Sequence, residues 1–188
     1  MTWTIIVLVV LALVLWSFYI SWRASRLDRL HNRVEAAHTA LDLALVRRAA
    51  AASELASSGL LDPAASLLLA DAVRRVRQVG PAERDLAESD LTRALRATLG
   101  DPDFRKEFGG GKDAGFQVAA DQGAGELVAE LDAAGQQVFI ARKFYNDLAG
   151  RTVDARRRPL VQVLHLYGSA QQPEFFDMDD AMVGEKIE

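Results

Sequence analysis

An uncharged apolar segment near the start of the chain constrains the fold more than any other feature. The segment Trp3–Trp22 reads WTIIVLVVLALVLWSFYISW. As an α-helix, a segment of this length extends about 30 Å, which matches the hydrocarbon core of a bilayer. Trp3 marks one end, and aromatic residues gather at the other end, where their rings favour the headgroup level. The sequence therefore predicts a transmembrane anchor over residues 1–22.

A cleaved signal peptide is the alternative interpretation of this segment. Signal peptides begin with basic residues and end at a small-residue cleavage site. The start MTWT has no basic side chain, and WSFYISW is a poor cleavage site. We therefore expect the segment to be retained.

Arginines after the segment predict its orientation. Four of them follow within residues 23–33: Arg23, Arg26, Arg29 and Arg33. Basic residues beside a span favour the cytoplasmic side, and they also attract anionic headgroups. We expect a single-pass protein of the plasma or inner membrane, with its N-terminus outside and its body in the cytoplasm. The predicted membrane-flanking residues are Trp3, Trp22, Arg23, Arg26 and Arg29.

The remaining sequence predicts an all-α body. An apolar stripe repeats at steps of three and four through Leu27, Leu30, Val34, Ala37, Leu41 and Leu45. No helix breaker occurs between Trp3 and Ser58, so one long helix should run from the anchor into the body and stop at Gly59.

Two shorter helices should follow. Asp62-Pro63 predicts an N-cap and first helical residue for a helix that ends near Val79. Its expected packed face contains Leu67, Ala70 and Val73 or Arg74. The next helix, over residues 82–99, should pack through Leu91, Leu95 and Leu99, with Leu86 nearby.

A glycine-rich loop and a last long helix complete the prediction. Residues 100 to about 123 should form the loop, with a helical turn near 104–108. The helix then carries a heptad seam through Leu127, Leu131, Ala134, Val138, Ala141, Tyr145 and Leu148. Because this seam is short for a free coiled coil, we predict an antiparallel helical bundle of about four helices over residues 23–158. Residues 159–188 should form a short amphipathic segment and a loose acidic tail.

The stretch ARKFYND, residues 141–147, concentrates the candidate site residues on this last helix. Tyr145 should lie on the seam, and Phe144 should pack on one shoulder. Arg142 and Asn146 share the other shoulder, and Lys143 faces solvent. A buried hydroxyl and a half-buried guanidinium both need partners, so we expect Arg142 or Tyr145 to meet Asp42, one helical turn from His38.

These segments resemble the LemA family. The last helix resembles the family's signature helix at Leu127, Glu130, Leu131, Ala141, Arg142, Phe144, Tyr145 and Asn146. The first helix is similar at Asn32, Val34, Ala37, Asp42, Leu45, Arg47 and Arg48, the third at Leu91, Leu95, Pro102 and Asp103, and the tail at Phe175 or Phe176. The sequence AAAASELAS after Arg48 and the arginine at position 158 depart from the family pattern, so the resemblance is to a divergent member. It implies an N-terminal membrane helix and an antiparallel bundle, with no established biochemical activity.

Catalytic, cofactor and metal motifs are weak in this chain. It has no cysteine, a formal charge of −4 and a pI near 5.4, which argues against thiolate chemistry and nucleic-acid partners. FGGGKD lacks the early glycine and the Ser or Thr of a phosphate loop, and DMDD lacks the spacing of a calcium loop. We predict no catalytic residue, cofactor site or metal site.

The leading hypothesis is a non-enzymatic scaffold or adaptor at the cytoplasmic membrane face. Its partners would be the lipid bilayer and another membrane or membrane-associated protein, with self-association left open. Two alternatives are a membrane-tethered metal-dependent hydrolase using His38 and Asp42, and a self-assembling membrane-remodelling protein.

Overall fold

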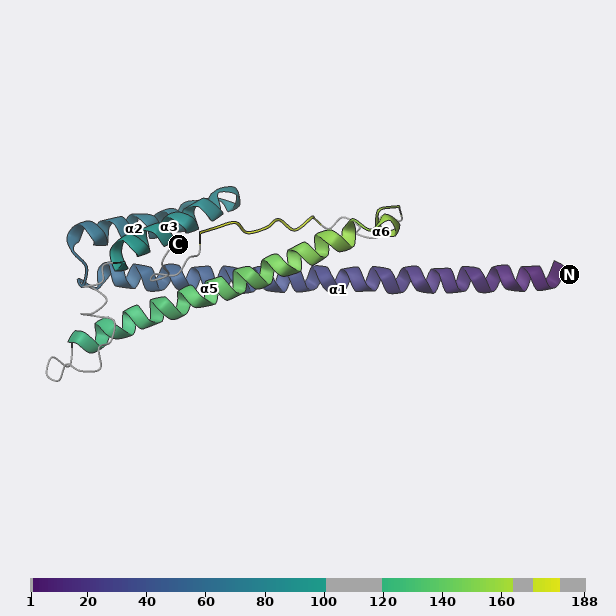
Figure 1. The fold of residues 1–188 in the computed structure, drawn as a ribbon, viewed down its shortest axis with the longest axis horizontal. Helices are drawn as coiled ribbons and strands as arrows, with labels where there is room; N and C mark the ends of the chain where they lie inside the picture. Colours follow the sequence, from purple (N-terminus) through teal and green to yellow (C-terminus); the bar gives the residue numbers. More distant parts are fainter. Residues whose placement is uncertain (1, 101–119, 164–170, 180–188) are drawn as a thin grey trace. The chain divides into compact units, whose positions relative to one another are not determined.

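The computed structural model describes residues 2–100, 120–163 and 171–179. Within these ranges all regular structure is helical, as predicted, and the part of the chain they cover contains no strand. Figure 1 labels the α-helices, which are α1 (Thr2–Ser57), α2 (Pro63–Gln78), α3 (Arg84–Leu99), α5 (Ala120–Arg156) and α6 (Pro159–Val163). A 3₁₀ helix, η1 (Pro81–Glu83), directly precedes α3. The helical turn expected near 104–108 lies outside the described residues.

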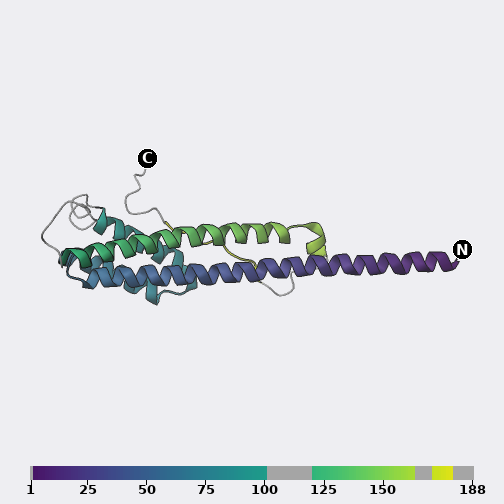
Figure 2. The same ribbon diagram turned by 90° about the horizontal axis from the view of Figure 1, so that it is seen from below.

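The chain divides into two compact units. The first unit comprises residues 1–38 and 144–175, and the second comprises residues 39–143 and 176–188. The two longest helices in Figure 2, α1 and α5, contribute residues to both units.

The helix α1 follows the sequence prediction along its whole length. It is unbroken from Thr2 to Ser57, and Gly59 then adopts φ +77°, a conformation that glycine tolerates best. Its first part, Thr2–Trp22, has a mean hydropathy of 2.5, and none of it is buried. This helix is therefore long and apolar enough to cross a membrane, and the protein itself does not cover its apolar surface.

The start of α2 shows why the helix begins at Pro63. The Asp62 carboxylate accepts hydrogen bonds from the backbone N–H groups of Ala64 and Ala65 at 2.9 and 3.1 Å. Proline at the first helical position loses no hydrogen bond, because its N–H would have had no helical partner. Both features confirm the predicted start.

The predicted packed face of α2 is partly wrong. Leu67 is 72% exposed and Ala70 is exposed, whereas Leu69, Ala72 and Val73 are buried. The three consecutive leucines at 67–69 fit more than one helical face. The sequence pattern alone therefore did not determine how α2 is rotated about its axis, and hence which of its side chains are buried. Leu86 on α3 is likewise exposed.

One hydrophobic cluster organises the second unit. It contains Ala49, Ala51, Ala52, Leu55, Leu61, Leu69, Ala72, Val73, Leu91, Ala94, Leu95, Leu99 and Leu131. These residues come from α1, the α1–α2 connection, α2, α3 and α5. The α3 stripe at Leu91, Leu95 and Leu99 is thus confirmed as core.

The first unit is packed through other parts of α1 and α5. Val34 and Ala37 of α1 are buried, as are Tyr145, Leu148 and Thr152 of α5. The short helix α6 turns off after the end of α5 (Figure 2). Residues 159–163 are therefore helical, as expected for the start of the amphipathic segment.

The acidic tail is not loose where the structure describes it. Phe176 and Met178 are buried in the second unit. The backbone N–H of Asp177 donates to the Asp85 carboxylate at 3.1 Å, and that of Asp179 donates to Ser89 Oγ at 3.0 Å. The prediction missed this docking because apolar side chains alternate with the aspartates, and α3 supplies their partners.

Candidate functional site

The stretch ARKFYND combines a buried tyrosine with exposed neighbours. Tyr145 is only 6% exposed, which confirms its predicted place on the seam. Phe144 is 58% exposed, so the expectation that it packs on a shoulder is wrong. The buried face of α5 is narrow here, and one residue along a helix turns the side chain by about 100°. Lys143 faces solvent, as predicted.

The hydroxyl of Tyr145 has a partner within the first unit. It donates to the backbone carbonyl of Glu174 at 2.7 Å. The ring of His38 meets the tyrosine ring edge-on at 5.4 Å between centroids. This arrangement fastens segment 171–175 and α1 to α5, and it assigns His38 a packing role.

Asp42, the residue expected to meet Arg142 or Tyr145, has another partner. Asp42 forms an ion pair with Arg84 at 2.9 Å. Arg142 and Asn146 are half-buried on α5. The predicted contact of Asp42 with Arg142 or Tyr145 stays a prediction. No group of three or more metal-ligating side chains occurs within the described ranges.

A buried ion pair in the second unit was missed by the sequence analysis. Arg48 Nη2 lies 2.7 Å from Glu88 Oε2, and the two side chains are 5% and 0% exposed. Arg48 Nη1 also donates to Thr92 Oγ1 at 3.0 Å. Arg48 Nε and Glu88 Oε1 have no hydrogen-bond partner among the residues that the structure describes. Burial raises the pKa of Glu88, and the neighbouring Arg48 opposes this shift.

The sequence did contain a signal for this pair. Glu88 lies three residues before Leu91 and seven before Leu95, on the same face of α3. An acid in line with core leucines predicts a buried cation nearby, because an unpaired buried carboxylate is costly. The pair holds α1 against α3 and has no access to solvent for chemistry.

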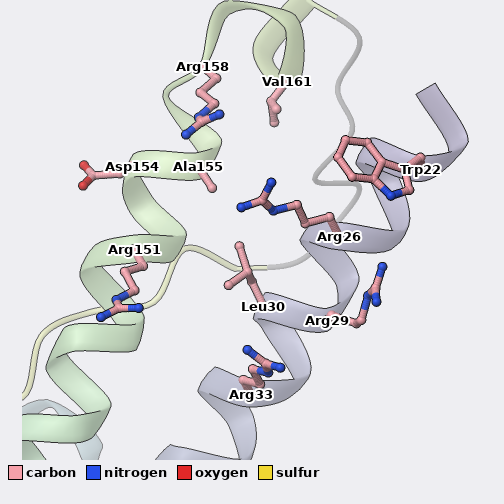
Figure 3. A pocket seen from close by; sticks show the side chains of 10 residues that line it. All are labelled: Trp22, Arg26, Arg29, Leu30, Arg33, Arg151, Asp154, Ala155, Arg158 and Val161. Carbon is pink, nitrogen blue, oxygen red and sulfur yellow. The ribbon is translucent and has the colours of Figure 1, made fainter. Parts of the chain in front are cut away.

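A pocket rich in arginine lies entirely within the first unit. Its volume is about 700 Å³, and Figure 3 shows the side chains that line it: Trp22, Arg26, Arg29, Leu30, Arg33, Arg151, Asp154, Ala155, Arg158 and Val161. We call this the arginine pocket. Helix α1 supplies one wall, and the end of α5 with α6 supplies the other. Among the described lining residues there are thus five arginines and one carboxylate, Asp154.

The side chains in the arginine pocket are arranged for an external anion. In Figure 3, Arg26 points from α1 towards α5, and Leu30 lies beside it. Arg158 comes from the opposite wall, whereas Asp154 points away from α1. The described lining residues therefore carry more positive than negative charge.

Only some of the pocket arginines form hydrogen bonds or ion pairs with described residues of the protein. Arg151 forms an ion pair with Asp147 at 3.0 Å, and Arg29 Nε donates to the Ser25 carbonyl at 3.2 Å. Arg26, Arg33 and Arg158 are exposed and make no hydrogen bond or ion pair through their side chains to any residue that the structure describes. This arrangement can bind an anion, and no Ser, Thr, Lys or His is among the lining residues that the structure describes.

The pocket walls are held in place by a neighbouring arginine. Arg156 Nη1 donates to the Gln171 carbonyl at 2.8 Å and lies 3.5 Å from His31 Nε2. These contacts tie the end of α5 to α1 and to segment 171–175. The sequence analysis identified Arg26, Arg29 and Arg33 beside the membrane segment, but it did not bring Arg151 and Arg158 to them, because that convergence depends on tertiary packing.

Comparisons with protein-family models, curated proteins and solved structures find no match to this chain. The resemblance to the LemA family therefore stays a prediction that depends on the residues quoted above.

Proposed function

We propose that the protein is a non-enzymatic, single-pass membrane protein that acts as a scaffold or adaptor at the cytoplasmic face of the plasma or inner membrane. The observation that carries this proposal is the helix segment Thr2–Trp22, which is apolar and has no residue buried inside the protein. Exposing this much apolar surface to water is unfavourable, and a bilayer removes it from water. The arginines that follow favour a cytoplasmic body.

The body is proposed to be an antiparallel bundle of about four helices related to the LemA family. The support is the hydrophobic cluster of the second unit, to which α1, α2, α3 and α5 all contribute. Direct packing of α2 on α3 adds to this support. A bundle of this kind presents helix faces to partners and needs no catalytic residues.

The partner of the proposed scaffold is another membrane or membrane-associated protein. The second unit exposes large apolar side chains on α1, α2, α3 and α5, among the described residues: Leu43, Val46, Leu67, Leu68, Leu86 and Ile140. Exposed apolar groups of this size favour protein contacts over water. A second copy of this protein is the alternative partner for the same side chains.

Two measurements test the proposed function. After an alkaline wash of membranes, the full-length protein should stay in the membrane pellet, and a variant lacking residues 2–22 should be released. A photoreactive residue at Leu43 or Leu67 should then yield a discrete cross-linked product in intact membranes, whereas one at Arg93, which is exposed on α3 and paired with Asp90, should not. Release of the full-length protein would contradict anchoring, and equal labelling at all three positions would contradict a defined partner surface.

A further inference from the structure

We infer that the arginine pocket is a binding site for a phosphate group, and specifically for the headgroup of an anionic membrane phospholipid. This inference depends on the proposed insertion of Thr2–Trp22 in a bilayer. It adds a defined lipid site to the anchor, with residues from α1 and, far away in the sequence, from the end of α5 and from α6.

The position of the pocket along α1 supports a lipid ligand. Trp22 ends the apolar segment and also lines the pocket. Arg26 lies four residues further, or about 6 Å along the helix axis. The headgroup region adds roughly 5 to 8 Å on each side of the hydrocarbon core. Arg26 therefore lies at the depth where lipid phosphates are found.

The chemistry of the pocket supports a phosphate over other ligands. A guanidinium donates two parallel hydrogen bonds to phosphate oxygens, and arginine is enriched where such groups are bound. Arg26 and Arg158 approach from opposite walls (Figure 3), so one phosphate placed between them can accept from both. Neither side chain must first give up a partner among the described residues.

The remaining lining fits the apolar part of a phospholipid. Leu30 is half-buried and Val161 is buried, and Ala155 lies between the arginines of the same wall. Free phosphate would leave the accessible parts of Leu30 and Ala155 in water. A phospholipid places its glycerol and upper acyl carbons against them, which is the reason to favour the lipid as the source of the phosphate.

Arg157 provides a matched control. It is adjacent to Arg158 and exposed, but it does not line the pocket. Replacing either arginine removes the same charge from the same region. General attraction to an anionic surface should therefore change equally in Arg157→Gln and Arg158→Gln, whereas a bound phosphate should respond mainly to Arg158→Gln.

The test uses the full chain with Trp22 as its single tryptophan. The protein has three tryptophans, so Trp3→Phe and Trp16→Phe leave only the residue in the pocket. The protein is placed in phosphatidylcholine vesicles that contain a minority of either brominated phosphatidylglycerol or brominated phosphatidylcholine. Bromine quenches tryptophan on contact, so the ratio of the two quenching curves gives the preference of the pocket for the anionic lipid.

We expect a clear preference for phosphatidylglycerol. Arg26→Gln and Arg158→Gln should each lower that preference about fivefold, as expected for the loss of one arginine contact at a membrane surface. Arg157→Gln should lower it less than about twofold, because a screened charge outside the pocket contributes weakly. An unchanged circular dichroism spectrum of each variant would show that the lower preference for phosphatidylglycerol is not caused by loss of folding.

Three outcomes distinguish a failure of the proposed pocket from a failure of the membrane anchor, and a lipid ligand from free phosphate. Equal quenching by both brominated lipids, or equal losses in Arg157→Gln and Arg158→Gln, would overturn the pocket while leaving the anchor intact. Absence of quenching by either lipid would overturn both. Relief of quenching by millimolar inorganic phosphate, but not by chloride at equal ionic strength, would support the phosphate site and identify solution phosphate as a second source.

Discussion

Tyr145 makes several contacts within the first unit, so its substitution should lower the stability of this unit. Its ring is buried, its hydroxyl donates to the Glu174 carbonyl, and His38 packs against its face. Tyr145→Ala should lower the free energy of unfolding by about 3 to 5 kcal/mol, the usual cost of deleting a large core ring. Urea unfolding of the full-length protein in detergent, followed by circular dichroism, measures this change.

Neighbouring residues provide the controls for Tyr145. Lys143→Ala, on the exposed face of the same helix, should change the free energy of unfolding by less than about 0.5 kcal/mol. Arg142→Ala should fall between the two, because its side chain is half-buried. A Tyr145→Ala protein as stable as the Lys143→Ala protein would contradict the packing role.

Glu88 should give the folded protein a measurable pH dependence. Burial raises the pKa of Glu88 above its ordinary value of 4.5, and Arg48 only partly offsets this. A raised pKa means that the folded state binds the proton more tightly than the unfolded state. The contribution of Glu88 to stability is therefore complete below pH 4.5 and is lost as the pH rises through the folded-state pKa.

Comparison of the wild-type protein with Glu88→Gln isolates this contribution. The difference in the free energy of unfolding, wild type minus variant, should fall as the pH rises above 4.5. A difference that increases with pH would show that the ion pair with Arg48 outweighs burial. Denaturant unfolding at a series of pH values in detergent distinguishes the two signs.

At the scale of helices and segments, the docked tail gives a local prediction. Arg96 donates to both carboxylate oxygens of Asp179, at 2.9 and 2.7 Å. Arg96→Ala should release residues 176–179 from α3, so the Asp177 and Asp179 amides should exchange hydrogen roughly three to ten times faster, as expected for losing a partly exposed charged contact. Hydrogen exchange of the full-length protein measures this rate.

A second arginine on α3 shows whether the effect is specific. Arg93 is exposed and forms its ion pair with Asp90 rather than with the tail. Arg93→Ala should leave the exchange of Asp177 and Asp179 unchanged. If both variants accelerate exchange equally, the Arg96 contact does not hold the tail.

Helix boundaries were predictable because local residues determine them. Gly59 ends the first helix region, and Asp62 caps the next one, as the sequence indicated. Rotation about a helix axis was less predictable where apolar residues are consecutive, which is why the packed face of α2 was misplaced. Tail docking and the arginine pocket depend on residues distant in the sequence, and no local pattern reports them.

At the scale of the whole molecule, one long helix carries both an apolar segment and the arginines that follow it. The segment Thr2–Trp22 was evident from composition alone, since a bilayer selects for length and apolarity. The opposing wall of the arginine pocket was not evident, because Arg151 and Arg158 follow Trp22 by more than a hundred residues. Both the proposed scaffold role and the proposed lipid site thus depend on the insertion and orientation of this helix in the membrane.

Single-cysteine labelling measures on which side of the membrane the N-terminus and the body lie. The chain has no cysteine, so Thr2→Cys and Ala70→Cys, both at exposed positions, each introduce one reactive thiol. With a maleimide that cannot cross membranes, Thr2→Cys should be labelled in intact cells, and Ala70→Cys only after the membrane is made permeable. Labelling of Ala70→Cys in intact cells, with Thr2→Cys protected, would contradict the proposed orientation and place the body outside.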